Sequence, residues 1–287
     1  MILRALAKRV VKRLLTVRPS QAAYKFVLRD LTPLLELPHA AQVIETRRFT
    51  SLVRPIVMPE LPARRAVVLA PHPDDDAFGV GGALLMLADA SAALRVIYLT
   101  DGPVDQVEGL RQDALASCAA VHAEPVFLHL PLRNMGLDDA AVTALGDAVT
   151  DFAPDIVFTP FLLDDHDDHR RANHLFSAAF ADRALKAEIW AYQIYSAVVP
   201  NVVLDITAVA ERKRALVRLW GHASGNRDWA HYVMGMNATA SRYIPGKGEN
   251  YGEPYFVVPS EEYFHLCRLY FAAPPSRIYR SDSYRQN

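Results

Sequence analysis

Two short clusters of histidine and aspartate carry residue types that bind divalent cations. The first is the sequence PHPDDD at residues 71–76, directly after the apolar run 66–70. Such a run is typical of a buried strand, and in an open parallel sheet ligands bind beyond the carboxyl ends of the strands. His72 and Asp75 offer atoms suited to zinc, and crowded carboxylates repel one another unless a cation lies among them. A solvated turn with an N-capping aspartate is the alternative.

The second cluster is the sequence DDHDDHRR at residues 164–171, which follows another buried-strand pattern at 154–160. If the two strands are neighbours, the clusters face each other across one crevice. His166 and His169 are three residues apart, which places them on one side of a helical turn. Either both bind a metal, or one binds it while the other acts on the substrate. A solvated acidic loop is the alternative interpretation.

Together the clusters resemble the signature motifs of the zinc-dependent PIG-L/LmbE-like de-N-acetylase family, whose motifs read [A/P]HPDDE and HxDH. The resemblance implies three zinc ligands: His72, Asp75 and His169. It implies three further catalytic residues: Asp74 as general base, His166 as a protonated stabiliser of the oxyanion, and Asp168 as the carboxylate that supports His166.

Weaker similarities extend this resemblance over roughly residues 65–258. They are TDG at 100–102, GLRQDA at 109–114, DIT at 205–207 followed by Lys213, and YGEPYF at 251–256. Asp76 stands where the family has glutamate, and one methylene fewer changes what its carboxylate can reach. The family's LPDG is here LPLR at 130–133. These departures leave the metal ligands intact and concern the substrate.

The resemblance implies a metal-dependent hydrolase that removes an N-acetyl group from an amino sugar or glycoconjugate by means of zinc-activated water. Two histidines and one carboxylate also suit Fe²⁺. The alternatives are a noncatalytic sugar- or metal-binding protein on the same fold, or an amidase that acts on a non-sugar amide. We expect Arg111, Asn250 and Tyr251 to contact a small-molecule or glycan substrate, although the loop 242–252 is equally compatible with a plain surface loop.

The composition is that of an ordinary globular protein with one sizeable core. The chain has 287 residues, is 51% apolar and has a formal net charge of −1, so it lacks the basic balance of a dedicated nucleic-acid binder. Cys118 and Cys267 lie far apart in the sequence, which argues against a disulfide framework and favours a reducing, cytoplasmic location.

Residues 1–20 contain six basic residues and no acid, with apolar residues at helical spacing. A secretory signal would need an uninterrupted apolar stretch, which these basic residues prevent. No apolar run reaches the ~18 residues of a spanning helix. Such a helix either lies on an anionic membrane surface at the cytoplasmic face, or packs on the core or on another subunit of a homo-oligomer; we favour packing. We expect a basic helical extension and proline-rich linker over 1–62, and a catalytic domain over 63–287.

Strand and helix patterns alternate after this linker. Predicted strands span 67–70, 94–99, 126–129, 155–159 and 188–192, and predicted helices span 78–90, 110–122, 138–152, 170–181 and 207–219. This alternation predicts an α/β fold with a Rossmann-like parallel sheet and helices on both faces. The glycines at 79, 81 and 82 lack the spacing of a dinucleotide-binding loop. They predict close packing of a helix on a strand behind the site.

Overall fold

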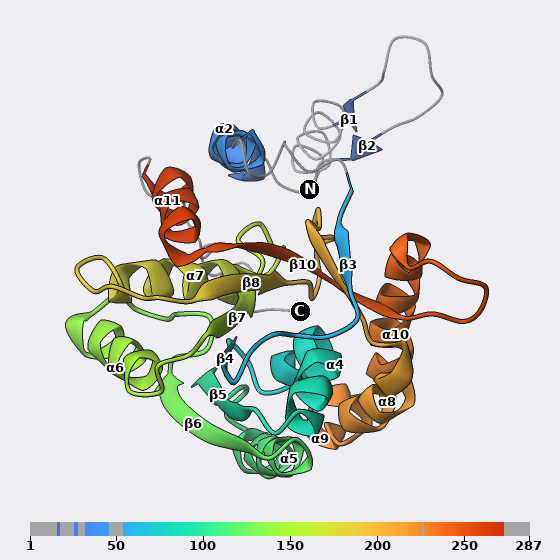
Figure 1. Cartoon of the computed structure of the whole chain (residues 1–287). Coiled ribbons are helices and arrows are strands. Elements are labelled where there is room, and N and C mark those ends of the chain that lie inside the picture. Colours follow the sequence, from blue (N-terminus) through green and yellow to red (C-terminus); the bar gives the residue numbers. More distant parts are fainter. Residues whose placement is uncertain (1–15, 18–25, 28–31, 46–53, 226, 273–287) are drawn as a thin grey trace, which may run out of the picture.

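Eight strands form one mixed sheet at the centre of the structure, which is a computed structural model that describes residues 16–17, 26–27, 32–45, 54–225 and 227–272. The strand order is β3-β9-β10-β8-β7-β4-β5-β6 (Figure 1). The strands are β3 (Ile56–Met58), β4 (Arg65–Ala70), β5 (Ala93–Thr100), β6 (Ala123–Leu130), β7 (Ile156–Pro160), β8 (Glu188–Tyr192), β9 (Val202–Asp205) and β10 (Gly252–Pro259).

The predicted fold class is confirmed, and the five predicted strands correspond to β4 to β8. The sheet differs from a fully parallel one because β10 runs antiparallel to both of its neighbours, β8 and β9. β3 lies inside the segment that we expected to be a linker, and it pairs in parallel with β9 as an edge strand.

Helices cover both faces of the sheet (Figure 1). One face packs on α4 (Asp75–Asp89), α5 (Val107–Ala120), α8 (Ala210–Arg218) and α10 (Trp229–Ala240). The other packs on α6 (Asp139–Thr150), α7 (Asp167–Ala179) and α11 (Ser260–Phe271). Shorter helical segments are η1 (Thr207–Val209), α9 (Gly221–Ser224) and η2 (Ser241–Tyr243).

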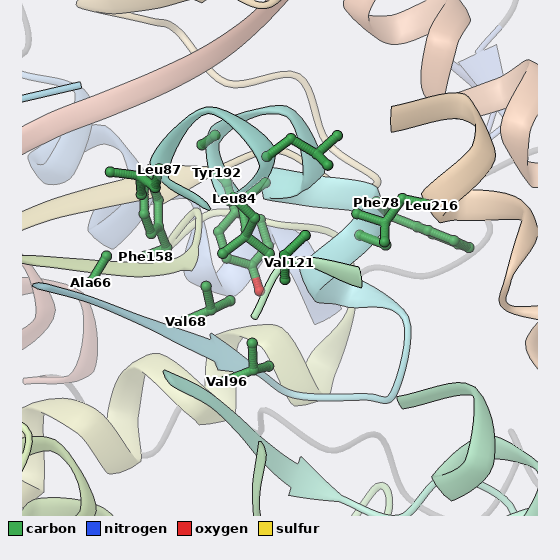
Figure 2. Packing of buried hydrophobic residues seen from close by; sticks show 14 of the residues in the cluster. Ala66, Val68, Phe78, Leu84, Leu87, Val96, Val121, Phe158, Tyr192 and Leu216 are labelled. Carbon is green, nitrogen blue, oxygen red and sulfur yellow. The ribbon is translucent and has the colours of Figure 1, made fainter. Parts of the chain in front are cut away.

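The strand that precedes the first cluster is buried on both sides. Successive side chains of a strand point to opposite faces, and in β4 Ala66 and Val68 join the core beneath α4 while Val67 and Leu69 join the core beneath α7. Figure 2 shows Val68 and Leu84 of α4 among the side chains of the first of these cores. Burial on both faces explains why β4 is a continuous apolar run rather than an alternating one.

The N-terminal segment is described only in part. Thr16–Val17 (β1) pairs with Phe26–Val27 (β2), and α2 (Thr32–Ile44) packs against α11. Thr16 and Val17 therefore lie in a strand and not in the basic helix expected over residues 1–20. The rest of residues 1–20 lies outside the described residues, so a helix there and its membrane contact stay predictions, as does the division into 1–62 and 63–287. Among the described helices, none has both the length and the apolar character needed to cross a bilayer.

The glycine run does bring α4 close to a strand, as predicted. A β-carbon on Gly79 would overlap the ring of Tyr192 on β8. The hydroxyl of Tyr192 donates to the backbone oxygen of Leu69 at 2.8 Å. Gly79 therefore allows α4 to lie against a residue that also holds the end of β4.

Candidate functional site

The two clusters meet at the carboxyl ends of β4 and β7, which are adjacent strands of the sheet. His72 follows β4, and His169 lies in the first turn of α7 after β7. Their ring centroids are 5.2 Å apart. The juxtaposition expected from the sequence is therefore present in the structure.

Three side-chain atoms form an equilateral triangle. Nδ1 of His72, Oδ2 of Asp75 and Nε2 of His169 lie 3.3 Å apart along each of the three edges. Two ligands at about 2.05 Å from a tetrahedral Zn²⁺ ion lie about 3.3 Å from each other. The donor set and its spacing therefore fit a zinc ion with an open fourth position.

A second grouping of ligand atoms takes His166 in place of Asp75. The three imidazoles each offer one nitrogen within 4.8 Å of the others. This spacing is looser than the triangle that includes Asp75, so the tighter triangle is the better match to a tetrahedral ion.

Each imidazole of the triangle has a buried carboxylate behind it. Nε2 of His72 donates to Oδ2 of Asp168 at 2.9 Å. Nδ1 of His169 lies 3.1 Å from Oδ1 of Asp164, a distance typical of an ion pair, although the contact is not a well-aligned hydrogen bond. Asp164 and Asp168 are both almost fully inaccessible to solvent. Carboxylates in this position orient ligating imidazoles and raise their basicity.

The ionisable groups of the triangle shift one another's pKa. Burial by itself lowers the pKa of His72, but hydrogen bonds to Asp168 and Asp75 raise it to about 9. Burial likewise lowers the pKa of His169, and Asp75 and Asp164 raise it to about 10. Burial raises the pKa of Asp75, yet His169 and His72 hold it well below its usual range. Without a cation, both imidazoles therefore carry the positive charge that balances these carboxylates.

Asp74 combines a strained backbone with an unusual carboxyl group. It occupies the N-cap of α4 with φ 111°, and its side chain makes no capping hydrogen bond. This conformation costs a residue other than glycine about 1–3 kcal/mol and is concentrated at functional sites. Burial and the adjacent Asp75 raise the pKa of Asp74 well above its usual value. The absence of a capping bond argues against the simple N-cap interpretation of this segment.

Asp76 points into the protein. Its Oδ2 accepts a hydrogen bond from the hydroxyl of Ser117 on α5 at 2.8 Å, and burial raises its pKa to about 6. The shorter side chain at this position therefore reaches a neighbouring helix.

The hydrogen-bond partner and the protonation state of His166 differ from those expected. We expected Asp168 to support a protonated His166, but the carboxylate of Asp168 accepts from His72 and from the backbone N–H of Arg133. The backbone N–H of Asp168 donates to Nδ1 of His166 at 3.1 Å, which caps α7. Burial, together with the charges of His72 and His169, lowers the pKa of His166 to about 3. His166 is therefore a neutral ring with its proton on Nε2.

The three residues expected to contact substrate lie on the same edge of the sheet but outside this cluster. The guanidinium of Arg111 lies 5.5 Å over the ring of Phe127, and the amide of Tyr251 donates to Oγ1 of Thr207. Asn250 is half-buried in the loop before β10. No contact described by the structure joins these three side chains to the triangle, and their role in substrate binding stays a prediction.

Sequence reasoning missed two residues of the site. Asp164 was noted only as part of the acidic cluster, and the rule that ligating histidines have carboxylate partners could have singled it out. The ring of Tyr195 stacks on His169 with centroids 5.5 Å apart, and its backbone N–H donates to Asp164. Tyr195 follows β8, and its place beside His169 depends on the order of the strands.

Residues 67–180 match the model of the PIG-L family, described as GlcNAc-PI de-N-acetylase. The matched range runs from β4 to the end of α7 and includes both clusters.

The chain is also similar to proteins of known name. Over 235 residues the chain is 23% identical to the diacetylchitobiose deacetylase of Thermococcus kodakarensis, which covers 71% of this chain and 86% of that protein. The solved structure of the N,N'-diacetylchitobiose deacetylase from Pyrococcus horikoshii has a TM-score of 0.60 at 21% identity, covering 70% of this chain and 86% of that one.

A second similar structure is named for a different kind of reaction. The 4-carboxy-2-hydroxymuconate hydratase of Pseudomonas putida KT2440 matches with a TM-score of 0.58 at 21% identity, covering 67% of this chain and 95% of that one. At this level of identity the structures show a common fold. The residues of the site, and not the fold, therefore decide which activity this chain can have.

Proposed function

We propose that this chain is a metal-dependent hydrolase that removes an N-acetyl group from an amino sugar or glycoconjugate. The observation that carries the proposal is the triangle of His72, Asp75 and His169, whose three ligand atoms lie 3.3 Å apart. The PIG-L family match and the similarity to diacetylchitobiose deacetylases support the choice of reaction and of an N-acetylated sugar as substrate.

Zn²⁺ is the metal that we propose, because the triangle has the edge length of tetrahedral zinc and leaves one position open. Fe²⁺ also accepts two imidazoles and one carboxylate. A divalent cation in the triangle would supply a Lewis acid that polarises a carbonyl oxygen and lowers the pKa of water. The donor set matches that chemistry, since each imidazole is held by a carboxylate.

Asp74 is the proposed general base. Its side chain does not cap α4, and it lies beside Asp75 without belonging to the triangle. The pKa of Asp74 would fall once a divalent charge balances Asp75. Asp74 then takes a proton from the attacking water and returns it to the amine that leaves, as general acid–base catalysis requires.

His166 is the proposed donor to the oxygen of the acetyl carbonyl. Because its Nδ1 accepts from the backbone of Asp168, its proton lies on Nε2. A neutral imidazole can donate to an oxyanion without first taking up a proton. Asp168 is not a ligand in the triangle; its carboxylate accepts a hydrogen bond from His72 and orients that imidazole.

Acetate release from a panel of N-acetylated amino sugars tests this function, with the chain stripped of metal and then reloaded with Zn²⁺ or Fe²⁺. We expect activity only with metal. The variant Asp74→Asn should keep Zn²⁺ and lose nearly all turnover, whereas Asp101→Asn, away from the triangle, should keep both.

Two outcomes contradict the proposal. Zn²⁺ binding without acetate release from any substrate would leave a noncatalytic metal-binding protein, and full turnover by Asp74→Asn would remove Asp74 as the base. Release of amine from acetylated compounds that contain no sugar would instead identify an amidase of another substrate class.

A further inference from the structure

α4 carries an internal break just after the turn that supplies Asp75. Val80 has φ −131° and ψ 15°, which are not helical values, although helix continues on both sides. In an unbroken helix the N–H of residue i pairs with the carbonyl of residue i−4. The break therefore disturbs the pairing between the N–H of Gly82 and the carbonyl of Phe78.

Two side chains form hydrogen bonds with the backbone groups that are left unpaired on the two sides of the break. The N–H of Gly82 donates to Oε1 of Glu253 at 2.7 Å, and the N–H of Ala83 donates to Oε2 at 2.9 Å. On the other side, Nζ of Lys213 donates to the carbonyl oxygen of Phe78 at 3.1 Å. The carboxylate thus caps the second part of the helix, and the ammonium group satisfies the end of the first part, as the helix dipole favours.

The two side chains also bind each other. Nζ of Lys213 lies 2.6 Å from Oε1 of Glu253, and both residues are completely inaccessible to solvent. The hydroxyl of Tyr255 donates to Oε2 of Glu253 at 2.6 Å. We call Lys213 and Glu253 the α4 wedge, because together they insert between Phe78 and Gly82.

A buried ion pair is a weak source of stability, since removing two charges from water costs about as much as their attraction returns. The α4 wedge therefore needs another explanation, and its contacts supply one. A side chain inserted into the hydrogen-bond ladder is a recognised cause of a helix kink. The kink sets the direction of the first turn of α4 relative to β4, and that turn contains Asp75.

We propose that Lys213 and Glu253 are positioning residues for the cation site, because their ion pair fixes the bend in α4 that brings Asp75 to the same distance from His72 as from His169. This inference rests on the cation site of the proposed function. Neither residue touches the triangle, and both act through the backbone of α4.

The test compares Zn²⁺ affinity, measured by competition with a chromophoric chelator, in the full chain and in the double variant Lys213→Met with Glu253→Gln. The double variant removes both charges together and so leaves no unpaired buried ion. We expect the double variant to bind Zn²⁺ at least about tenfold more weakly. Losses of this size are typical when residues that hold metal ligands in place are replaced. Hydrogen exchange of the Gly82 and Ala83 amides should become faster.

Two variants separate positioning from general destabilisation. Arg212→Met lies next in sequence to Lys213 and removes an exposed ion pair with Asp89 at the far end of α4, and it should leave affinity unchanged. Val233→Ala opens the same core from α10 and should lower Tm without changing affinity. A double variant that folds and binds Zn²⁺ as tightly as the parent overturns the inference, as does an equal loss in Val233→Ala.

If the double variant does not fold, Tyr255→Phe decides the question. It removes one hydrogen bond to Glu253 and keeps the ring. A weakening of about threefold or more supports the inference, and unchanged affinity overturns it. A parent chain that binds Zn²⁺ but releases no acetate contradicts the proposed function alone, whereas a variant of unchanged affinity in an active parent contradicts the positioning role alone.

Discussion

The carboxylate behind His72 offers a sharp test of the cation site. Asp168 is fully buried and accepts from Nε2 of His72 at 2.9 Å. The variant Asp168→Asn keeps the size of the side chain and one acceptor oxygen but removes the negative charge. His72 then becomes a less basic ligand. Losing such a partner weakens metal binding about 10- to 100-fold, which corresponds to about 1.4–2.7 kcal/mol.

The chain contains a matched control for this change. Asp101 also lies 2.9 Å from a histidine nitrogen, Nδ1 of His129, but this pair is more exposed and outside the triangle. Zn²⁺ titration against a competing chelator should show the loss in Asp168→Asn and no change in Asp101→Asn. If Asp168→Asn binds Zn²⁺ within about twofold of the parent, Asp168 does not support a ligand and the assignment of His72 fails.

Two further predictions concern protons and packing. His72 and His169, with pKa raised to about 9 and about 10, are both protonated near pH 7 without metal. Zn²⁺ must displace both protons, and the raised pKa of Asp74 falls when the cation binds. Apparent affinity should therefore rise at least about 100-fold from pH 7 to pH 8, and calorimetry in buffers of different ionisation enthalpy should detect at least two released protons; a pH-independent affinity contradicts this. Gly79→Ala should lower unfolding free energy by about 1–3 kcal/mol, because its methyl overlaps Tyr192. Gly235→Ala, with open space around it, should raise that energy by about 0.5–1 kcal/mol; denaturant unfolding of both variants checks the contrast.

The parts of the fold that the sequence predicts are those with strong local patterns. β4 and β7 are short apolar runs bounded by charged residues or turns, and both are buried strands in the structure. β10 carries no such pattern, because Pro254 and Pro259 interrupt it. Its pairing with β8 begins only at Tyr255, so Pro254 lies beyond the residues that pair on that side. Only the assembled sheet shows that such a segment is a strand.

For the site, too, the sequence predicts local patterns but not the contacts between distant segments. The two clusters indicate a shared cation, and the family resemblance implies that His72, Asp75 and His169 are its ligands. The structure brings the ligand atoms of these three residues together. The sequence does not show which aspartate faces which imidazole. Asp168 precedes His169 in the chain yet contacts His72, which follows the neighbouring strand β4, since the first turn of α7 directs successive side chains in different directions.

The torsion angle of Asp74 has a consequence for any attempt to make this protein more robust. Glycine adopts a positive φ without the steric conflict of a β-carbon, so Asp74→Gly would relieve strain in the loop and delete the proposed base in one step. A screen that rewards heat tolerance alone would favour that replacement. A screen that also requires turnover would reject it, because glycine at this position favours stability whereas the proposed reaction needs the carboxylate.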